Sequence, residues 1–357
     1  MSFDASPPTG PAATQRLRSA ADLVAAIPYL LGFHPADSLV LISTRSAGQL
    51  GVEFTLRVDL PPPSAVADMA AELAEVVCAQ RCEELLLVVV GGGSRVGRSP
   101  DRPLPRAELV AAVVEACAAS GAVAWATIWV AELAADAPWR CYGACGCGGE
   151  LPDPASSPVA AAAVVAGQVT YADRAELERV VAPGNPAALR RREALLNRRM
   201  EELCLAGKGF AAGPEELATL ERWIDVAAVD RPQLGDEDVV RLCLALSDTM
   251  VRDAAFGFAF EATAAAAERL WSTLVSELPD PESAEAAMLL AHSALMRGDG
   301  ALAGVALRRA QQAWPGHPLS AMVQAALQAG CGPDELRDWF IEGSQRATEE
   351  LAARAKP

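Results

Sequence analysis

The sequence predicts an α/β domain with a mixed sheet, followed by an all-α domain of helical hairpins of the tetratricopeptide-like kind. Strand-like apolar segments alternate with amphipathic helical segments over the first ~140 residues, which is typical of α/β layers. No strand pattern follows Thr170, and the remaining segments have helical periodicity. A chain of 357 residues with 52% apolar residues is long and apolar enough for two cores. We expect a flexible tail over 1–15, the α/β domain over 16–150 and the helical domain over 160–350.

The first elements predict a helix followed by two antiparallel strands. Ser19 is a suitable N-cap for a helix through Leu31, with Pro28 as a kink or stop. Residues 37–44 and 51–60 have strand patterns separated by a short polar turn, so we expect them to pair antiparallel.

The next elements predict parallel strands. A helix over 64–79 leads to the near-continuous apolar run 83–90, which is typical of a strand buried on both faces. A helix over 106–119 then connects it to a strand over 122–132. A strand–helix–strand unit of this kind implies a right-handed crossover and a parallel pair. Residues 136–158 show little regular pattern.

Helices are predicted from Asp173 onward. Start signals such as Asn185-Pro186 and Pro214 divide the region into segments, namely 186–205, 214–229, 236–253, 254–278 and 283–297. If Pro315 is the terminal proline of a 34-residue tetratricopeptide-like unit, that unit begins at Ala284, although a plain helix pair fits as well. The arginines over 190–199 alternate with glutamates, which favours a solvated, salt-bridged helix face.

Composition excludes several partners and locations. The net charge of −16 argues against nucleic acid or an anionic membrane as a partner, because both need basic patches. No apolar run approaches the ~18–20 residues of a membrane span. The beginning of the sequence lacks the pattern of a signal peptide. Nine cysteines in such a chain predict the reduced thiols of a cytoplasmic protein.

A loop over 139–149 contains Cys141, Cys145 and Cys147 with the spacing C-x3-C-x-C. Thiolates this close, among glycines that let the backbone fold around an ion, are suitable ligands for zinc or another soft metal. A tetrahedral zinc site needs a fourth ligand, which would come from Cys78, Cys82 or a partner's thiol. The alternative is a set of reduced or transiently oxidised thiols in a loop packed under Trp139.

Polar residues at strand ends are the candidate ligand-binding residues. Arg57 and Asp59 share one face of their strand because side chains alternate with period two, and they either bind a ligand or form a salt bridge that fixes the strand end. His34 lies in a turn, where it either acts as a base or faces solvent. Glu132 ends the second parallel strand, and the Gly91–Gly97 loop follows the first.

Five segments together carry a family resemblance. They are residues 27–40, 57–61, 139–149, 173–177 and 298–310. Together they resemble the domain of unknown function 4192 family of high-GC bacteria, over nearly the whole chain. That family tends to have adjacent cysteines followed by proline, whereas Gly146 separates Cys145 from Cys147 here. The resemblance implies the two-part architecture and assigns no activity.

The favoured function is a non-catalytic interaction or regulatory protein. No G-x-S-x-G, H-E-x-x-H or Cys–His nucleophile pattern is present, and stacked helical hairpins provide concave surfaces for a protein partner. The alternative is an enzyme or small-molecule-binding protein. Its site would lie at the C-terminal ends of the parallel strands, beside the cysteine loop.

Overall fold

The computed structural model describes residues 4–6, 19–45, 51–93, 103–165, 167–205, 214–329, 331 and 333–354. The chain divides into two compact units. The first comprises Met1–Glu176, Arg297–Ala301 and Leu327–Gly330, and the second comprises Leu177–Met296, Leu302–Ala326 and Cys331–Pro357. Most of the tail expected over 1–15 lies outside the described residues, and Asp4–Ser6 within it form a strand.

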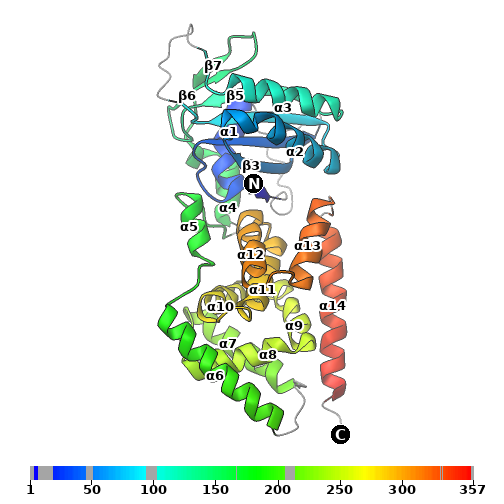
Figure 1. Cartoon of the computed structure of the whole chain (residues 1–357). Helices are drawn as coiled ribbons and strands as arrows, with labels where there is room; N and C mark the ends of the chain where they lie inside the picture. The colour runs from blue at the N-terminus through cyan, green and yellow to red at the C-terminus, as the bar shows by residue number, and fades with distance from the viewer. Residues whose placement is uncertain are drawn as a thin grey trace. The chain divides into compact units, whose positions relative to one another are not determined.

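The first unit is built on a mixed sheet (Figure 1). Its strands are β1 (Asp4–Ser6), β2 (Ser38–Arg45), β3 (Gly51–Asp59), β4 (Glu84–Val90), β5 (Val123–Val130), β6 (Pro138–Cys141) and β7 (Gly148–Glu150). In the described residues the order is β1-β3-β2-β4-β5-β6-β7. β4 and β5 are parallel and the other neighbours are antiparallel. The predicted mixed α/β sheet is therefore confirmed, including its antiparallel β2–β3 pair and its parallel β4–β5 pair.

Helices cover the sheet because its central strands are apolar on both faces. β4 pairs with β2 on one side and β5 on the other, and Leu85 to Val90 are all buried. One face packs into a core with α2 (Val66–Ala79), which follows the short 3₁₀ turn η1 (Pro63–Ala65), and with α3 (Ala107–Ala119), which lies against α2.

The helix α1 (Ala20–Leu31) contacts β3. The Ser19 hydroxyl caps it by accepting the Asp22 N–H at 3.2 Å, as the sequence predicts. Pro28 lies inside the helix, which continues one turn to Leu31 and ends at Gly32 with φ of 71°. A proline removes one backbone hydrogen bond, and here the burial of the surrounding apolar residues is sufficient to keep the helix intact.

The β6–β7 hairpin was not predicted, because residues 136–158 show no regular pattern. The two short strands contain proline, cysteine and glycine, which are poor indicators of a strand. They form because the edge of β5 offers open hydrogen-bonding groups, which Trp139 to Cys141 pair with. The hairpin carries the cysteine loop. The short η2 (Pro154–Ser156) and the helix α4 (Pro158–Val165) follow it.

The regular elements in the rest of the described residues are helices. The helices are α5 (Arg174–Arg179), α6 (Pro186–Leu205), α7 (Pro214–Val229), α8 (Asp236–Ser247), α9 (Thr249–Ala255), α10 (Ala264–Glu277), α11 (Ser283–Arg297), α12 (Gly300–Ala313), α13 (Pro318–Gln328) and α14 (Pro333–Arg354), with a 3₁₀ segment η3 (Phe256–Phe260). Among all the described residues, including those of the first unit, no helix is both long and apolar enough to cross a bilayer.

Two of the predicted helices are divided differently. The expected helix over 236–253 breaks at Asp248, whose carboxylate accepts the Met250 N–H at 2.8 Å and caps α9. The expected helix over 254–278 begins as η3 and resumes as α10. Both breaks place aromatic residues of η3 between α9, α10 and α14.

The arginine-rich stretch of α6 is not wholly a solvated face. Arg191 is 61% exposed, as predicted, but Arg192 is only 7% exposed. Arg192 forms ion pairs with Asp236 of α8 and Glu277 of α10. It therefore joins three helices, a role that sequence spacing within α6 does not reveal.

Candidate functional site

The predicted pair Arg57 and Asp59 forms an ion pair on one face of β3, with Nη2 and Oδ1 2.6 Å apart. The guanidinium is buried, donates through Nε to the Ser38 hydroxyl at 2.8 Å, and lies 6.0 Å from the centre of the Phe33 ring. The Asp59 carboxylate is 70% exposed. Arg57 thus holds the end of β3 to neighbouring elements while Asp59 faces solvent.

The sheet register places several predicted residues at one end of the sheet. Ser38 pairs with both Asp59 and Val90, and Val90 pairs with Val130. Asp59 and the exposed Glu132 therefore lie at the same end of the sheet. The Asp37 carboxylate there accepts the Gly92 N–H at 2.8 Å.

The other strand-end features are less informative. His34 is exposed in the turn before β2, and its backbone N–H donates to the Tyr171 carbonyl at 3.1 Å. Residues 94–97 of the glycine-rich loop lie outside the described residues.

The three predicted cysteines come together at the tip of the β6–β7 hairpin. The Cys141 N–H donates to the Cys147 carbonyl at 2.9 Å. Two further backbone N–H groups point at sulfur: Gly143 donates to Cys141 Sγ and Cys147 donates to Cys145 Sγ, each at 3.4 Å. Cys145 and Cys147 are exposed, and Cys141 is partly buried.

Hydrogen bonds distinguish the three thiols. The hydrogen bonds from Cys147, and to a smaller extent the one from the Cys141 thiol, lower the pKa of Cys145. The bond to Cys145 raises the pKa of Cys147, and burial raises the pKa of Cys141. As the side chains stand, no group of three or more His, Cys, Asp or Glu among the described residues is arranged to hold a metal ion. Zinc or another soft metal at these cysteines stays a prediction.

The second unit contains an apolar pocket of about 260 Å³ that sequence reasoning did not identify. It is lined by Asp253 of α9, Phe256 of η3, Leu319 and Met322 of α13, and Trp339, Phe340, Gly343 and Ser344 of α14. Phe256 and Phe340 are buried, whereas Met322 and Trp339 are 45% and 54% exposed. The pocket therefore has a buried aromatic floor and an apolar rim that reaches solvent.

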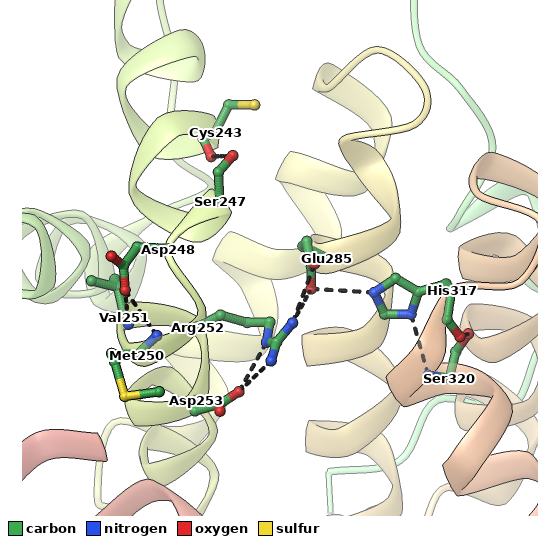
Figure 2. A network of polar contacts seen from close by, with 10 residues as sticks. All are labelled: Cys243, Ser247, Asp248, Met250, Val251, Arg252, Asp253, Glu285, His317 and Ser320. Carbon is green, nitrogen blue, oxygen red and sulfur yellow. Dashed lines mark hydrogen bonds and ion pairs between the residues drawn. The ribbon is translucent and has the colours of Figure 1, made fainter. Parts of the chain in front are cut away.

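An ion-pair network fixes the one carboxylate in this pocket (Figure 2). Arg252 donates through Nε and Nη2 to Asp253 Oδ1 at 2.9 and 2.7 Å, and through Nη1 to Glu285 of α11. Both of these Asp253 contacts fall on Oδ1.

The network continues to the buried His317, which precedes α13. Glu285 Oε2 lies 3.3 Å from His317 Nε2, and His317 Nδ1 accepts the Ser320 N–H at 3.2 Å. The Nδ1 atom is thus the acceptor on the α13 side, and Nε2 is the ring nitrogen on the Glu285 side. The network thus connects the segments that carry Asp253 and Leu319.

The floor of the pocket rests on His292 of α11. Its ring lies 5.0 Å from Phe256, 5.4 Å from Phe260 and 4.1 Å from Phe340, measured between ring centres. Its Nε2–H group donates to the Phe256 carbonyl at 3.1 Å. Burial lowers the pKa of His292 to about 3. The ring is therefore neutral and acts as a packing residue that also fixes η3.

Only weak signals in the sequence indicate this pocket. Phe256–Phe260 is an aromatic-rich segment, and Trp339-Phe340 is an adjacent aromatic pair, in a chain with 5% aromatic residues. Clusters of this kind identify candidate interface residues. That they meet is a consequence of tertiary packing between α9, η3 and α14.

Comparison with known proteins identifies one family. The sequence model described as "Domain of unknown function (DUF4192)" matches residues 21–334. No curated protein and no solved structure matches the chain.

Proposed function

Because the chain belongs to the DUF4192 family, a domain of unknown function, we propose its role from the site itself: a non-catalytic interaction or regulatory protein whose helical unit binds a protein partner. The observation that supports the proposal is the apolar pocket between α9, α13 and α14, with Trp339 and Met322 exposed at its rim. Trp and Met are enriched at protein interfaces and are unusual on the remaining surface.

The size of the pocket favours a side chain over a free ligand. About 260 Å³ is below the ~300–1,000 Å³ of pockets that enclose small molecules. A large apolar side chain that enters such a pocket is the usual anchor of an interface.

The charge around the pocket favours a basic partner segment. Asp253 is one of the residues that line the pocket, and α14 has more acidic than basic residues. The whole chain carries −16. Opposite charges steer association and select partners. We therefore expect the partner to present an aromatic or long aliphatic side chain flanked by Lys or Arg.

Helical hairpins of the tetratricopeptide-like kind are the scaffold that we infer for this unit. In support, α11 and α12 follow each other across a short turn, and Arg309 of α12 donates to Asp280, just before α11, at 2.5 Å. We place the protein in the cytoplasm, on its reduced-thiol composition.

The test is affinity purification from native extract, followed by calorimetry with the recovered partner. The Met322→Lys variant adds a cation to the apolar rim, where it would repel a basic segment, and Trp339→Ala removes the largest exposed ring. We expect each to weaken binding about tenfold or more, since truncation of an interface anchor costs above ~1.4 kcal/mol.

Val226→Lys is the matched control, because Val226 of α7 is 48% exposed and lies outside the pocket lining. It should bind like the wild type. A partner that tolerates both pocket variants, or that loses affinity equally with Val226→Lys, would contradict the proposal.

The second candidate is a small-molecule binder or enzyme at the C-terminal ends of β4 and β5. The register supports it, since Asp59 and Glu132 lie at one end of the sheet. A ligand bound there should raise the unfolding midpoint in a small-molecule panel, and Glu132→Gln should abolish that rise. A midpoint that responds to no compound would count against this candidate.

A further inference from the structure

The cysteine hairpin is held in a fixed conformation by contacts that do not involve sulfur. The Tyr142 N–H donates to the Thr127 carbonyl of β5 at 2.9 Å, and the Tyr142 hydroxyl donates to the Pro105 carbonyl at 2.5 Å. A Cβ on Gly148 would lie 2.9 Å from the Trp139 carbonyl oxygen, so the strands approach closely there. The three thiols are therefore presented on an anchored hairpin rather than on a loose loop.

Within the hairpin, the Cys145 sulfur accepts a backbone hydrogen bond. It receives the Cys147 backbone N–H at 3.4 Å, and the Cys147 thiol in turn donates to the Cys145 carbonyl at 3.9 Å. Cys141 Sγ also accepts a backbone N–H, from Gly143, but Cys141 is partly buried. Hydrogen bonds to sulfur favour the thiolate, which is the nucleophilic form. Cys145 is also exposed, so a small oxidant can reach it.

The remaining cysteines lack this combination. Cys82, Cys117 and Cys243 are buried, and Cys331 is partly buried. Cys204 is exposed but has no cysteine near it in sequence, and Cys78 is exposed but its neighbour in sequence, Cys82, is buried. Redox-sensitive cysteines are solvent-accessible and lie next to a thiol that can resolve the first oxidation product. Among the described residues, the hairpin unites both conditions.

We propose that Cys145 is a site of reversible oxidation by peroxides, with Cys141 or Cys147 as the resolving thiol. The Cys145 thiolate attacks a peroxide oxygen, the O–O bond breaks, and Cys145 becomes a sulfenic acid as hydroxide leaves. The resolving sulfur then attacks the Cys145 sulfur. The S–S bond forms, the S–O bond breaks, and water leaves with the thiol's proton. For hydrogen peroxide, two thiols and one peroxide yield one disulfide and two waters.

The experiment uses the full chain, purified anaerobically without a histidine tag, with its metal content measured first by elemental analysis. It is then treated with one equivalent of hydrogen peroxide. We expect a mass loss of about 2 Da, which dithiothreitol reverses, and a peptide map that joins Cys145 to Cys141 or Cys147. Cys145→Ser should abolish the loss, whereas Cys204→Ser, which removes an exposed thiol from α6, should retain it.

Three outcomes would overturn the inference. One is oxidation spread equally over Cys145, Cys78 and Cys204. Another is a sulfinic acid on Cys145 with no disulfide, since it would show that no neighbouring thiol resolves the first product. The third is about one metal ion per chain that is lost in the Cys145→Ser, Cys147→Ser variant, because the thiols would then be ligands.

Discussion

His292 shows how one residue can tie stability to pH without taking part in chemistry. Its ring is fully buried among Phe256, Phe260 and Phe340. Burial lowers its pKa to about 3, against about 6.5 in an unfolded chain. The unfolded state therefore binds a proton between these two pH values that the folded state does not. Stability is complete above pH 6.5 and decreases as the pH falls towards 3.

We predict that wild-type unfolding free energy falls by about 2 kcal/mol between pH 7 and pH 5, as this pKa difference requires. His292→Phe should remove most of that fall, although losing the bond to the Phe256 carbonyl lowers its stability at pH 7. Urea unfolding at both pH values measures the effect. His34→Gln, at an exposed position, is the control and should behave like the wild type. An equal pH slope in His292→Phe would show that other groups cause it.

At the scale of elements, the sequence is sufficient to predict a helix or strand whose own residues carry its start signals and periodicity. Ser19 and Asn185 are caps whose side chains accept backbone N–H groups at 3.2 and 2.8 Å, and the helices that they begin were predicted. The β6–β7 hairpin was missed because its strands depend on the edge of β5 rather than on their own sequence. The cysteines were recognised from spacing alone. The pocket was missed because its residues come from four elements that only tertiary packing assembles.

Arg192 joins elements through charge. Its guanidinium, 7% exposed, pairs with Asp236 of α8 and Glu277 of α10. Arg191 shares Asp236 but is 61% exposed. The hydrogen bond from Arg191 contributes most to lowering the pKa of Asp236, and the one from Arg192 contributes less. Together they outweigh burial, which acts to raise that pKa. Breaking a buried ion pair leaves a carboxylate without its partner, whereas an exposed pair contributes little.

We predict that Arg192→Ala destabilises the protein by about 3 kcal/mol, at the lower end for breaking a buried pair. Arg191→Ala, its neighbour on the same helix, should cost no more than about 0.5 kcal/mol. Chemical denaturation of the two variants at pH 7 compares them directly. Similar losses in both would mean that the burial of Arg192 does not determine its contribution.

At the scale of the whole molecule, the net charge of −16 sets two opposite responses to salt. Repulsion between exposed carboxylates opposes the compact state and is screened by salt. The arginine ion pairs stabilise the fold and would be weakened by salt if they were exposed. Arg192, Arg252 and Arg309 are 7%, 16% and 6% exposed, and buried pairs are screened much less. Screening of the repulsion should therefore prevail.

We predict that raising NaCl from about 10 mM to about 150 mM at pH 7.5 increases the unfolding midpoint by about 2–4 °C, the shift that ~1 kcal/mol produces in a unit of this size. Near pH 4.5 many carboxylates are protonated and the net charge approaches zero, so the same addition should have little effect. Scanning calorimetry at both pH values tests this. A midpoint that falls with salt at pH 7.5 would show that exposed ion pairs outweigh the repulsion. In that case the net negative charge would have only a weak long-range effect. Binding of the basic partner segment proposed for the pocket would then depend mainly on the apolar contact.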